Sequence, residues 1–201
     1  MRLSAAMVSL AALAALAASQ GANAAMVWDE SINGDLSNDG LAPQALTLFP
    51  GSNQLVGSTG DGGQGVDRDY FTFTLTPGQT LTSIRLLGNT FVSGAFSFIG
   101  IQTGPQVTVQ PSGAGGNLLL GWTHYSMNDI GTDILPAITS GGPLSPGTYS
   151  VWVQDTGGPA TYGFDLGVTG VTPVPLPPSL LLMASTLLGL GGIFRRRVST
   201  G

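Results

Sequence analysis

Hydrophobic and polar residues alternate with a period of two along much of the middle of the chain. In residues 70–76, Phe71, Phe73 and Leu75 fall on one side of an extended backbone, and three threonines fall on the other. Successive side chains of a β-strand point to opposite faces of its sheet, so this pattern is typical of a strand with one buried face. It predicts a half-buried antiparallel strand.

Short apolar or alternating segments recur along the chain, separated by turn signals such as Pro77-Gly78. The predicted strands are residues 46–49, 54–57, 80–87, 95–102, 106–110, 118–122, 149–154 and 162–168. Residues 118–122 are apolar enough to predict burial on both faces, and residues 129–138 predict a single helical turn. Many short strands without a long amphipathic helix predict an all-β domain, an antiparallel β-sandwich or jelly roll.

The N-terminal end has the pattern of a secretory signal peptide. Arg2 precedes an apolar stretch over residues 3–18, and Ala22 and Ala24 frame an A-x-A cleavage sequence. We therefore expect signal peptidase to remove residues 1–24, which leaves an exported domain over residues 25–172.

The C-terminal end predicts a membrane-spanning segment. Residues 178–194 are uncharged, and at about 1.5 Å per residue they cross most of a ~30 Å hydrocarbon core. Three arginines follow directly, and they predict a cytoplasmic end and an exported body. The three are Arg195, Arg196 and Arg197.

Residues 173–201 resemble the PEP-CTERM sorting signal of Gram-negative bacteria. The resemblance lies in the order of its parts: the sequence Val174-Pro175-Leu176-Pro177, an apolar helix and a terminal arginine cluster. It implies recognition and cleavage by a membrane-embedded exosortase, after which the protein stays at the cell surface or in the extracellular matrix. Leu176 stands where that family usually has glutamate. An ordinary single-pass anchor is the alternative.

The exported body, over about residues 50–170, resembles the bacterial pre-peptidase C-terminal (PPC) domain. The similarity runs through Asp69-Tyr70-Phe71-Thr72-Phe73, Pro77-Gly78-Gln79, Gly147-Thr148-Tyr149 and Tyr162-Gly163-Phe164. The resemblance implies a small β-sandwich that serves as an accessory, often adhesive module and in some members binds calcium at its loops. It carries over no catalytic residues.

The charge and the absence of cysteine limit which partners and metal sites this protein can have. Residues 25–174 contain all 11 acidic residues but only Arg68 and Arg85 as bases, so their formal charge is −9. Such a body is repelled by phosphate backbones, which excludes nucleic acid as a partner. The chain has no cysteine, so disulfides and thiolate metal sites are excluded as well. Calcium and neutral or basic glycans remain.

Five aspartates are candidate calcium ligands. Asp35 and Asp39 occupy the first and fifth positions of an EF-hand-like loop, although Leu46 replaces its last acid. Residues 62–67 match one G-G-x-G-x-D repeat in a stretch too glycine-rich to predict regular structure; Asp67 ends the repeat, and Asp61 and Asp69 lie on either side of it. Solvated acidic turns are the alternative, and no cofactor is required.

No catalytic constellation is present, so we expect a protein that is not an enzyme. His124, the one histidine, lacks a nucleophile elbow near Ser126, and Asp129 is one acid among many. Glycoside hydrolysis requires two carboxylates with separated pKa values, and the body has a single glutamate, Glu30. Trp152, opposite the predicted core face of its strand, is a candidate for sugar stacking or for burial.

These observations predict an exported, exosortase-processed, non-catalytic surface or matrix protein with a structural or adhesive role in association with exopolysaccharide. Before processing, its C-terminal helix holds it in the membrane. The alternatives are a calcium-dependent glycan-binding module and a secreted hydrolase.

Overall fold

The computed structural model describes residues 24–61, 63, 65–90, 96–112, 115–155 and 157–170. The cleavage residue Ala22 and the predicted sorting signal, with Val174, Pro175, Pro177 and the arginine cluster, lie outside these residues. Within the described ranges, neither helix is long and apolar enough to cross a membrane. The described part is all-β, as predicted, with mostly antiparallel strands.

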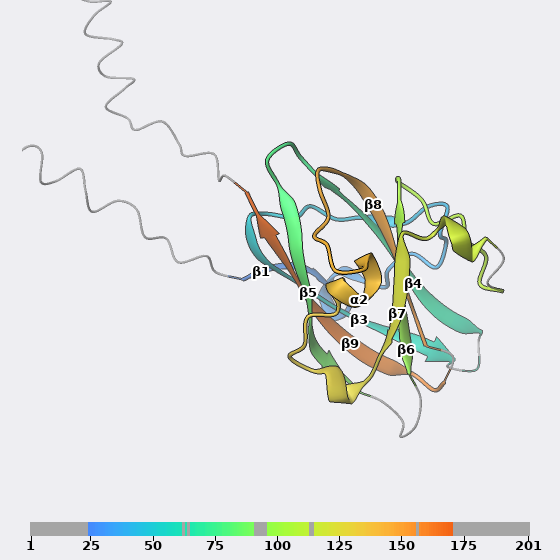
Figure 1. Ribbon diagram of the computed structural model, residues 1–201. Coiled ribbons are helices and arrows are strands. Elements are labelled where there is room, and N and C mark those ends of the chain that lie inside the picture. The colour runs from blue at the N-terminus through green and yellow to red at the C-terminus, as the bar shows by residue number, and fades with distance from the viewer. Residues whose placement is uncertain are drawn as a thin grey trace, which may run out of the picture. The chain divides into compact units, whose positions relative to one another are not determined.

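The nine strands of the described residues are hydrogen-bonded into one network, which divides into two sheets at a single short pairing of two strands (Figure 1). The first sheet has the order β1-β3-β9-β5 and contains β1 (Ala25–Asp29), β3 (Gly51–Asp61), β9 (Ala160–Thr169) and β5 (Thr80–Asn89). The second has the order β2-β4-β8-β6-β7 and contains β2 (Gln44–Ala45), β4 (Val66–Leu75), β8 (Gly147–Gln154), β6 (Ser97–Thr103) and β7 (Gly121–Tyr125). Only β1 with β3 and β2 with β4 pair in parallel.

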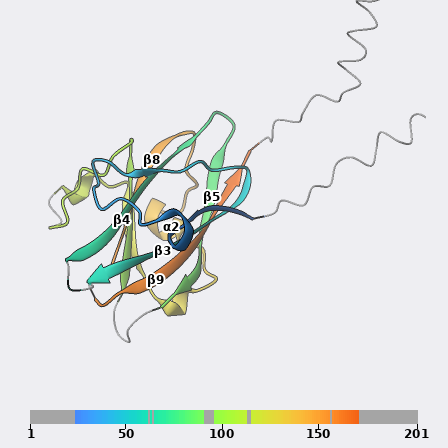
Figure 2. The ribbon, with the colours of Figure 1, turned by 180° about the vertical axis from the view of Figure 1, so that it is seen from behind.

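The sheets are joined by a hairpin, in which Gly60 and Asp61 of β3 pair with Asp67 and Val66 of β4. The N-terminal segment, blue in Figure 2, contacts both of these strands, because β1 pairs in parallel with β3 and β2 pairs in parallel with β4. The remaining elements are one or two turns long: α1 (Glu30–Asn33), η1 (Gly116–Leu118), η2 (Met127–Asp129) and α2 (Leu135–Thr139).

The core lies between the sheets and follows the period-two pattern. Phe71, Phe73 and Leu75 of β4 are buried, as predicted. They belong to one cluster with Leu55, Phe164, Leu166, Ile84 and Leu86 of the first sheet and Ile99, Ile101, Val151 and Val153 of the second. Burial of apolar area at about 25 cal/mol per Å² is the main stabilising contribution in a chain without disulfides.

Three of the predicted strands are wrong or displaced. In residues 46–49, β2 has already ended at Ala45; Leu46 N–H still donates to the Thr72 carbonyl, but Phe49 N–H donates to the Asn53 side chain. Residues 106–110 form no strand, since Val107 N–H donates to the Gly40 carbonyl. Residues 118–122 are split between η1 and β7, and Trp122 is exposed.

The glycine-rich stretch 60–68 is more regular than predicted, because β3 extends to Asp61 and β4 begins at Val66. The predicted helical turn in residues 129–138 corresponds to α2, which is shifted toward the C-terminus. Pairing between the two strands explains the longer β3 and β4. Gly60 and Asp61 pair with Asp67 and Val66, so their backbone groups are hydrogen-bonded across the hairpin although the sequence itself does not favour a strand.

The packing of α2 against β7 predicts that Gly121→Ala is destabilising. A Cβ at Gly121 lies 1.7 Å from the Ile138 carbonyl oxygen, so α2 or β7 must move. We expect the free energy of unfolding to fall by about 1–3 kcal/mol, the usual cost of overpacking, in urea denaturation. Gly116→Ala is the matched control, because its Cβ position meets no atom within 4 Å beyond its chain neighbours and its own helix backbone; equal losses in both variants contradict this account.

Candidate functional site

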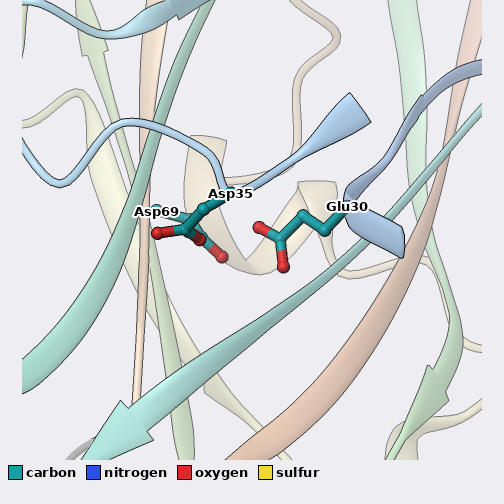
Figure 3. A group of neighbouring side chains, drawn as sticks. All are labelled: Glu30, Asp35 and Asp69. Atoms are coloured by element: carbon teal, nitrogen blue, oxygen red, sulfur yellow. The ribbon is translucent and has the colours of Figure 1, made fainter. Parts of the chain in front are cut away.

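Three carboxylates from two separate parts of the sequence converge in the described structure. Glu30 is the first residue of α1, Asp35 follows that helix, and Asp69 belongs to β4. One carboxylate oxygen from each lies within 4.8 Å of the others. Figure 3 shows the Glu30 carboxylate directed toward those of Asp35 and Asp69. We call these three residues the acidic cluster.

Local sequence explains how α1 presents its carboxylate. Asp29 caps the helix by accepting from Ser31 N–H at 2.9 Å. Gly34, at φ 88°, ends the helix after one turn and donates its N–H to the Glu30 carbonyl. Glu30 then reaches β3, where its Oε2 accepts from Ser58 N–H at 2.7 Å and from the Ser58 hydroxyl at 3.0 Å.

Asp69 is the most deeply placed member of the cluster, with 0 % of its surface exposed. Its Oδ2 accepts a hydrogen bond of 2.6 Å from the Tyr162 hydroxyl of β9. Its Oδ1 is buried and has no hydrogen-bond partner among the described residues, and the same holds for Oδ1 of Asp67, two residues earlier in β4. A buried carboxylate oxygen without a partner costs free energy, and a proton or a cation would offset that cost.

Gly57 leaves the space in which the cluster assembles. It pairs with Tyr162 across β3 and β9. A Cβ at this position lies 2.5 Å from the Tyr162 hydroxyl oxygen and 3.0 Å from Glu30 Oε1. A larger residue therefore displaces the donor to Asp69 and the Glu30 carboxylate together.

The cluster is electrostatically strained when it holds no cation. Burial raises the pKa of Asp69 to about 9, against the lowering effect of the Tyr162 hydrogen bond, and the neighbouring charges of Glu30, Asp67 and Asp35 raise it further. Burial is also the main cause of the raised pKa of Glu30 and of Asp35. With a pKa of about 9, Asp69 retains a proton at neutral pH unless a positive charge replaces it.

The donor set fits a hard divalent cation. Calcium takes carboxylate, carbonyl and water oxygens at about 2.3–2.6 Å, and the cluster offers only oxygen. The unpartnered Asp69 Oδ1 is the observation that separates this site from an ordinary acidic turn. Glu30, Asp35 and Asp69 would hold the ion, and Asp67 lies near enough to raise the pKa of two of them.

Two of the five predicted calcium ligands, Asp35 and Asp69, belong to the cluster, and Asp67 lies close to it. The EF-hand-like loop does not converge on one point, because Asp39 Oδ1 accepts from Leu41 N–H at 2.8 Å within its own turn. The single G-G-x-G-x-D repeat lies at the β3–β4 hairpin, where Asp61 Oδ1 accepts from Gly63 N–H at 2.8 Å.

Glu30, the first residue of α1 after the capping Asp29, was not among the predicted calcium ligands. Reasoning from motifs missed it, since Glu30 belongs to neither calcium-like pattern. Its neighbours Ser58 and Asp69 come from β3 and β4, and only the folded arrangement of the strands brings them next to α1.

The catalytic candidates do not form a triad. Ser126 donates its hydroxyl to Asp129 Oδ2 at 2.9 Å, and these two residues cap η2. His124 is exposed on β7, among aromatic rings. Trp152, the predicted glycan candidate, is only 5 % exposed and stacks on Tyr70 with 5.9 Å between ring centroids. Its ring points away from the core, as predicted, but lies beneath other side chains.

Comparison with known proteins identifies no family. No family model matches the chain, and no curated protein matches it. A solved structure that does match is the Salmonella Typhimurium protein PliG, a periplasmic lysozyme inhibitor of g-type lysozyme. The two share 13 % identity over 63 % of this chain and 98 % of that one, with a TM-score of 0.28. A likeness of this degree carries no functional inference.

Proposed function

We propose that the chain is an exported, non-catalytic protein of the cell surface or extracellular matrix, whose β-sandwich is completed by a calcium ion at the acidic cluster. The observation that carries the calcium role is the buried Asp69 carboxylate, with one oxygen on Tyr162 and the other without a hydrogen-bond partner. A cation joins α1, the segment after it and β4, and so ties the start of the exported chain to the sandwich.

The strand order supports a jelly-roll assignment for this sandwich. One sheet contains β3-β9-β5 and the other β4-β8-β6-β7. The chain therefore alternates between the sheets from β3 to β6, as it does in a jelly roll, then stays in the second sheet through β7 and β8 and returns to the first at β9. The segment between β7 and β8 approaches the remaining edge position through isolated bridges from Asp133 and Leu144 to β5. The resemblance to the PPC domain agrees with such a module.

Export and sorting are supported by the sequence alone. The apolar N-terminal stretch, the A-x-A sequence at Ala22 to Ala24 and the tripartite segment 173–201 remain the basis for signal peptidase, exosortase and membrane as partners. Association with exopolysaccharide follows from this address and from the acidic, lysine-free body.

Calcium titration of the full-length protein, freed of cations with a chelator, tests the proposal. A ligand that binds only the folded state raises the unfolding midpoint by linkage. We expect the midpoint to rise with calcium up to about 10 mM, above the ~1 mM affinity of the weakest extracellular calcium modules, and magnesium to have a smaller effect. An unmoved midpoint over that range removes the calcium role.

A further inference from the structure

The outer face of the second sheet carries a groove of about 430 Å³, within the range of about 300–1,000 Å³ that is usual for small-ligand sites. One wall comes from strands β6, β7 and β8 and the segment before β6. The other comes from the connection between β6 and β7. We call it the aromatic groove and define it by Phe96, Phe98, Trp122, His124, Trp152 and Gln154.

Strand register assembles the aromatic wall. Gly100 of β6 pairs with Trp122 of β7 on one side and with Trp152 of β8 on the other. The Phe98 ring occupies the space over this glycine, 5.9 Å from the Trp122 ring and 4.7 Å from the Trp152 ring between centroids. A Cβ at Gly100 would lie 2.9 Å from Phe98 Cζ, so glycine allows the three rings to form one continuous surface.

The rings differ in their exposure. Trp152 is the buried floor, since it packs with Val107 and Val109 of the covering segment. Trp122 is 51 % exposed and Phe96 64 % exposed, and His124 lies edge-on to Trp122 at 5.3 Å. Grouped, solvent-exposed aromatic side chains mark binding surfaces more often than chance exposure does. Rigid rings also lose little conformational entropy when a ligand binds.

The described lining of the groove contains polar side chains but no acidic side chain and no lysine or arginine. Arg68 Nε donates to Gln154 Oε1 at 2.8 Å and so fixes the amide, whose NH₂ has no acceptor among the described residues. The Ser112 hydroxyl and the His124 imidazole also line the groove.

This combination selects an uncharged, hydroxyl-rich ligand with an apolar face. The C–H face of a pyranose ring stacks on an indole, and its hydroxyls match the amide, imidazole and hydroxyl groups beside it. An anionic chain would meet no fixed cation in the groove and would approach a body of formal charge −9.

We propose that the aromatic groove binds a neutral polysaccharide chain, with one sugar ring stacked on Trp122. The choice of a polysaccharide as the ligand rests on the proposed function, which places the protein in a polysaccharide matrix. The geometry of the groove is independent of the acidic cluster, because the two share no residue.

Affinity electrophoresis of the full-length protein through gels containing dextran, hydroxyethyl cellulose, laminarin or galactomannan tests the proposal, with alginate as an anionic counterpart. We expect at least one neutral gel to retard the protein and Trp122→Ala to weaken that binding at least about tenfold, as removal of a central aromatic anchor does. Trp122→Tyr should restore part of it. Phe49→Ala is the matched control, because Phe49 is 52 % exposed and does not line the groove.

Four outcomes overturn the groove proposal: no retardation in any neutral gel, retardation by alginate alone, equal loss in the Trp122 and Phe49 variants, or self-association in sedimentation velocity that Trp122→Ala abolishes. The last result makes a second copy of the chain the occupant. Unfolding midpoints of all variants check that they fold. The calcium titration is scored separately, so failure of the cation role and failure of the groove are distinguishable.

Discussion

Asp69→Asn is expected to remove most of the calcium response and, in chelator above neutral pH, to leave the protein more stable than the wild type. Asparagine has nearly the same volume and keeps an oxygen for the Tyr162 hydroxyl, which donates to Asp69 at 2.6 Å. It removes the charge that faces Glu30, Asp35 and Asp67. The variant therefore mimics the protonated carboxyl and lacks the anionic ligand.

The size of the effect follows from linkage. At a calcium concentration of about 100 times the dissociation constant, the wild type gains about 2.7 kcal/mol, which for a domain of this size shifts the unfolding midpoint by roughly 5–10 °C. Thermal unfolding with and without calcium measures both proteins. Asp61→Asn is the matched control, because that carboxylate caps Gly63 at the hairpin. A full calcium shift in the Asp69 variant, or an equal loss in the Asp61 variant, contradicts the site.

The strands were predictable where one local pattern determined the outcome. The alternation of Phe71, Phe73 and Leu75 predicts a strand with one buried face, and any second sheet packed against that face buries it. Val107 and Val109 show the limit of the same rule. They alternate as residues of a strand do, and they are buried, yet they belong to a loop that covers Tyr70 and Trp152. An extended loop that packs on a sheet buries every second side chain, just as a strand does, so the pattern does not distinguish the two.

The acidic cluster was only partly predictable, because its geometry depends on long-range pairing. Asp69 carried a local signal as part of an acidic approach to a strand. Its burial depends on Tyr162 and Gly57, which β9 and β3 bring opposite each other. Glu30 joins them through the parallel pairing of β1 with β3, a contact with no short-range sequence signature.

The choice between tryptophans shows the same limit. Trp122 and Trp152 flank Gly100 in one row across the second sheet. Trp152 lies on β8, inside the sheet and under Val109, whereas Trp122 lies on the edge strand β7. Sequence reasoning named Trp152 as the candidate for sugar stacking, with burial as the other interpretation, and its ring is buried. Strand order decides which of the two rings is accessible.

The stability of the cation-free protein is expected to fall as pH rises from about 4 to about 9. Burial raises the folded-state pKa of Asp69 from 3.8 to about 9, so over this range the folded protein holds a proton that the unfolded chain has released. The free energy of unfolding therefore decreases with pH, by about 1.4 kcal/mol per unit from this one group. The raised pKa values of Glu30 and Asp35 act in the same direction.

Calcium should reverse this dependence, because the ion takes the place of the proton and binds more tightly as the carboxylates ionise. Denaturation in urea across this pH range, in chelator and in calcium, measures both slopes, and the difference between the two curves should widen toward high pH. Asp69→Asn should flatten the chelator curve, since its side chain does not titrate. A wild-type curve in chelator that rises steadily with pH would show that Asp69 is ionised in the folded protein, and a site built on its burial would then be wrong.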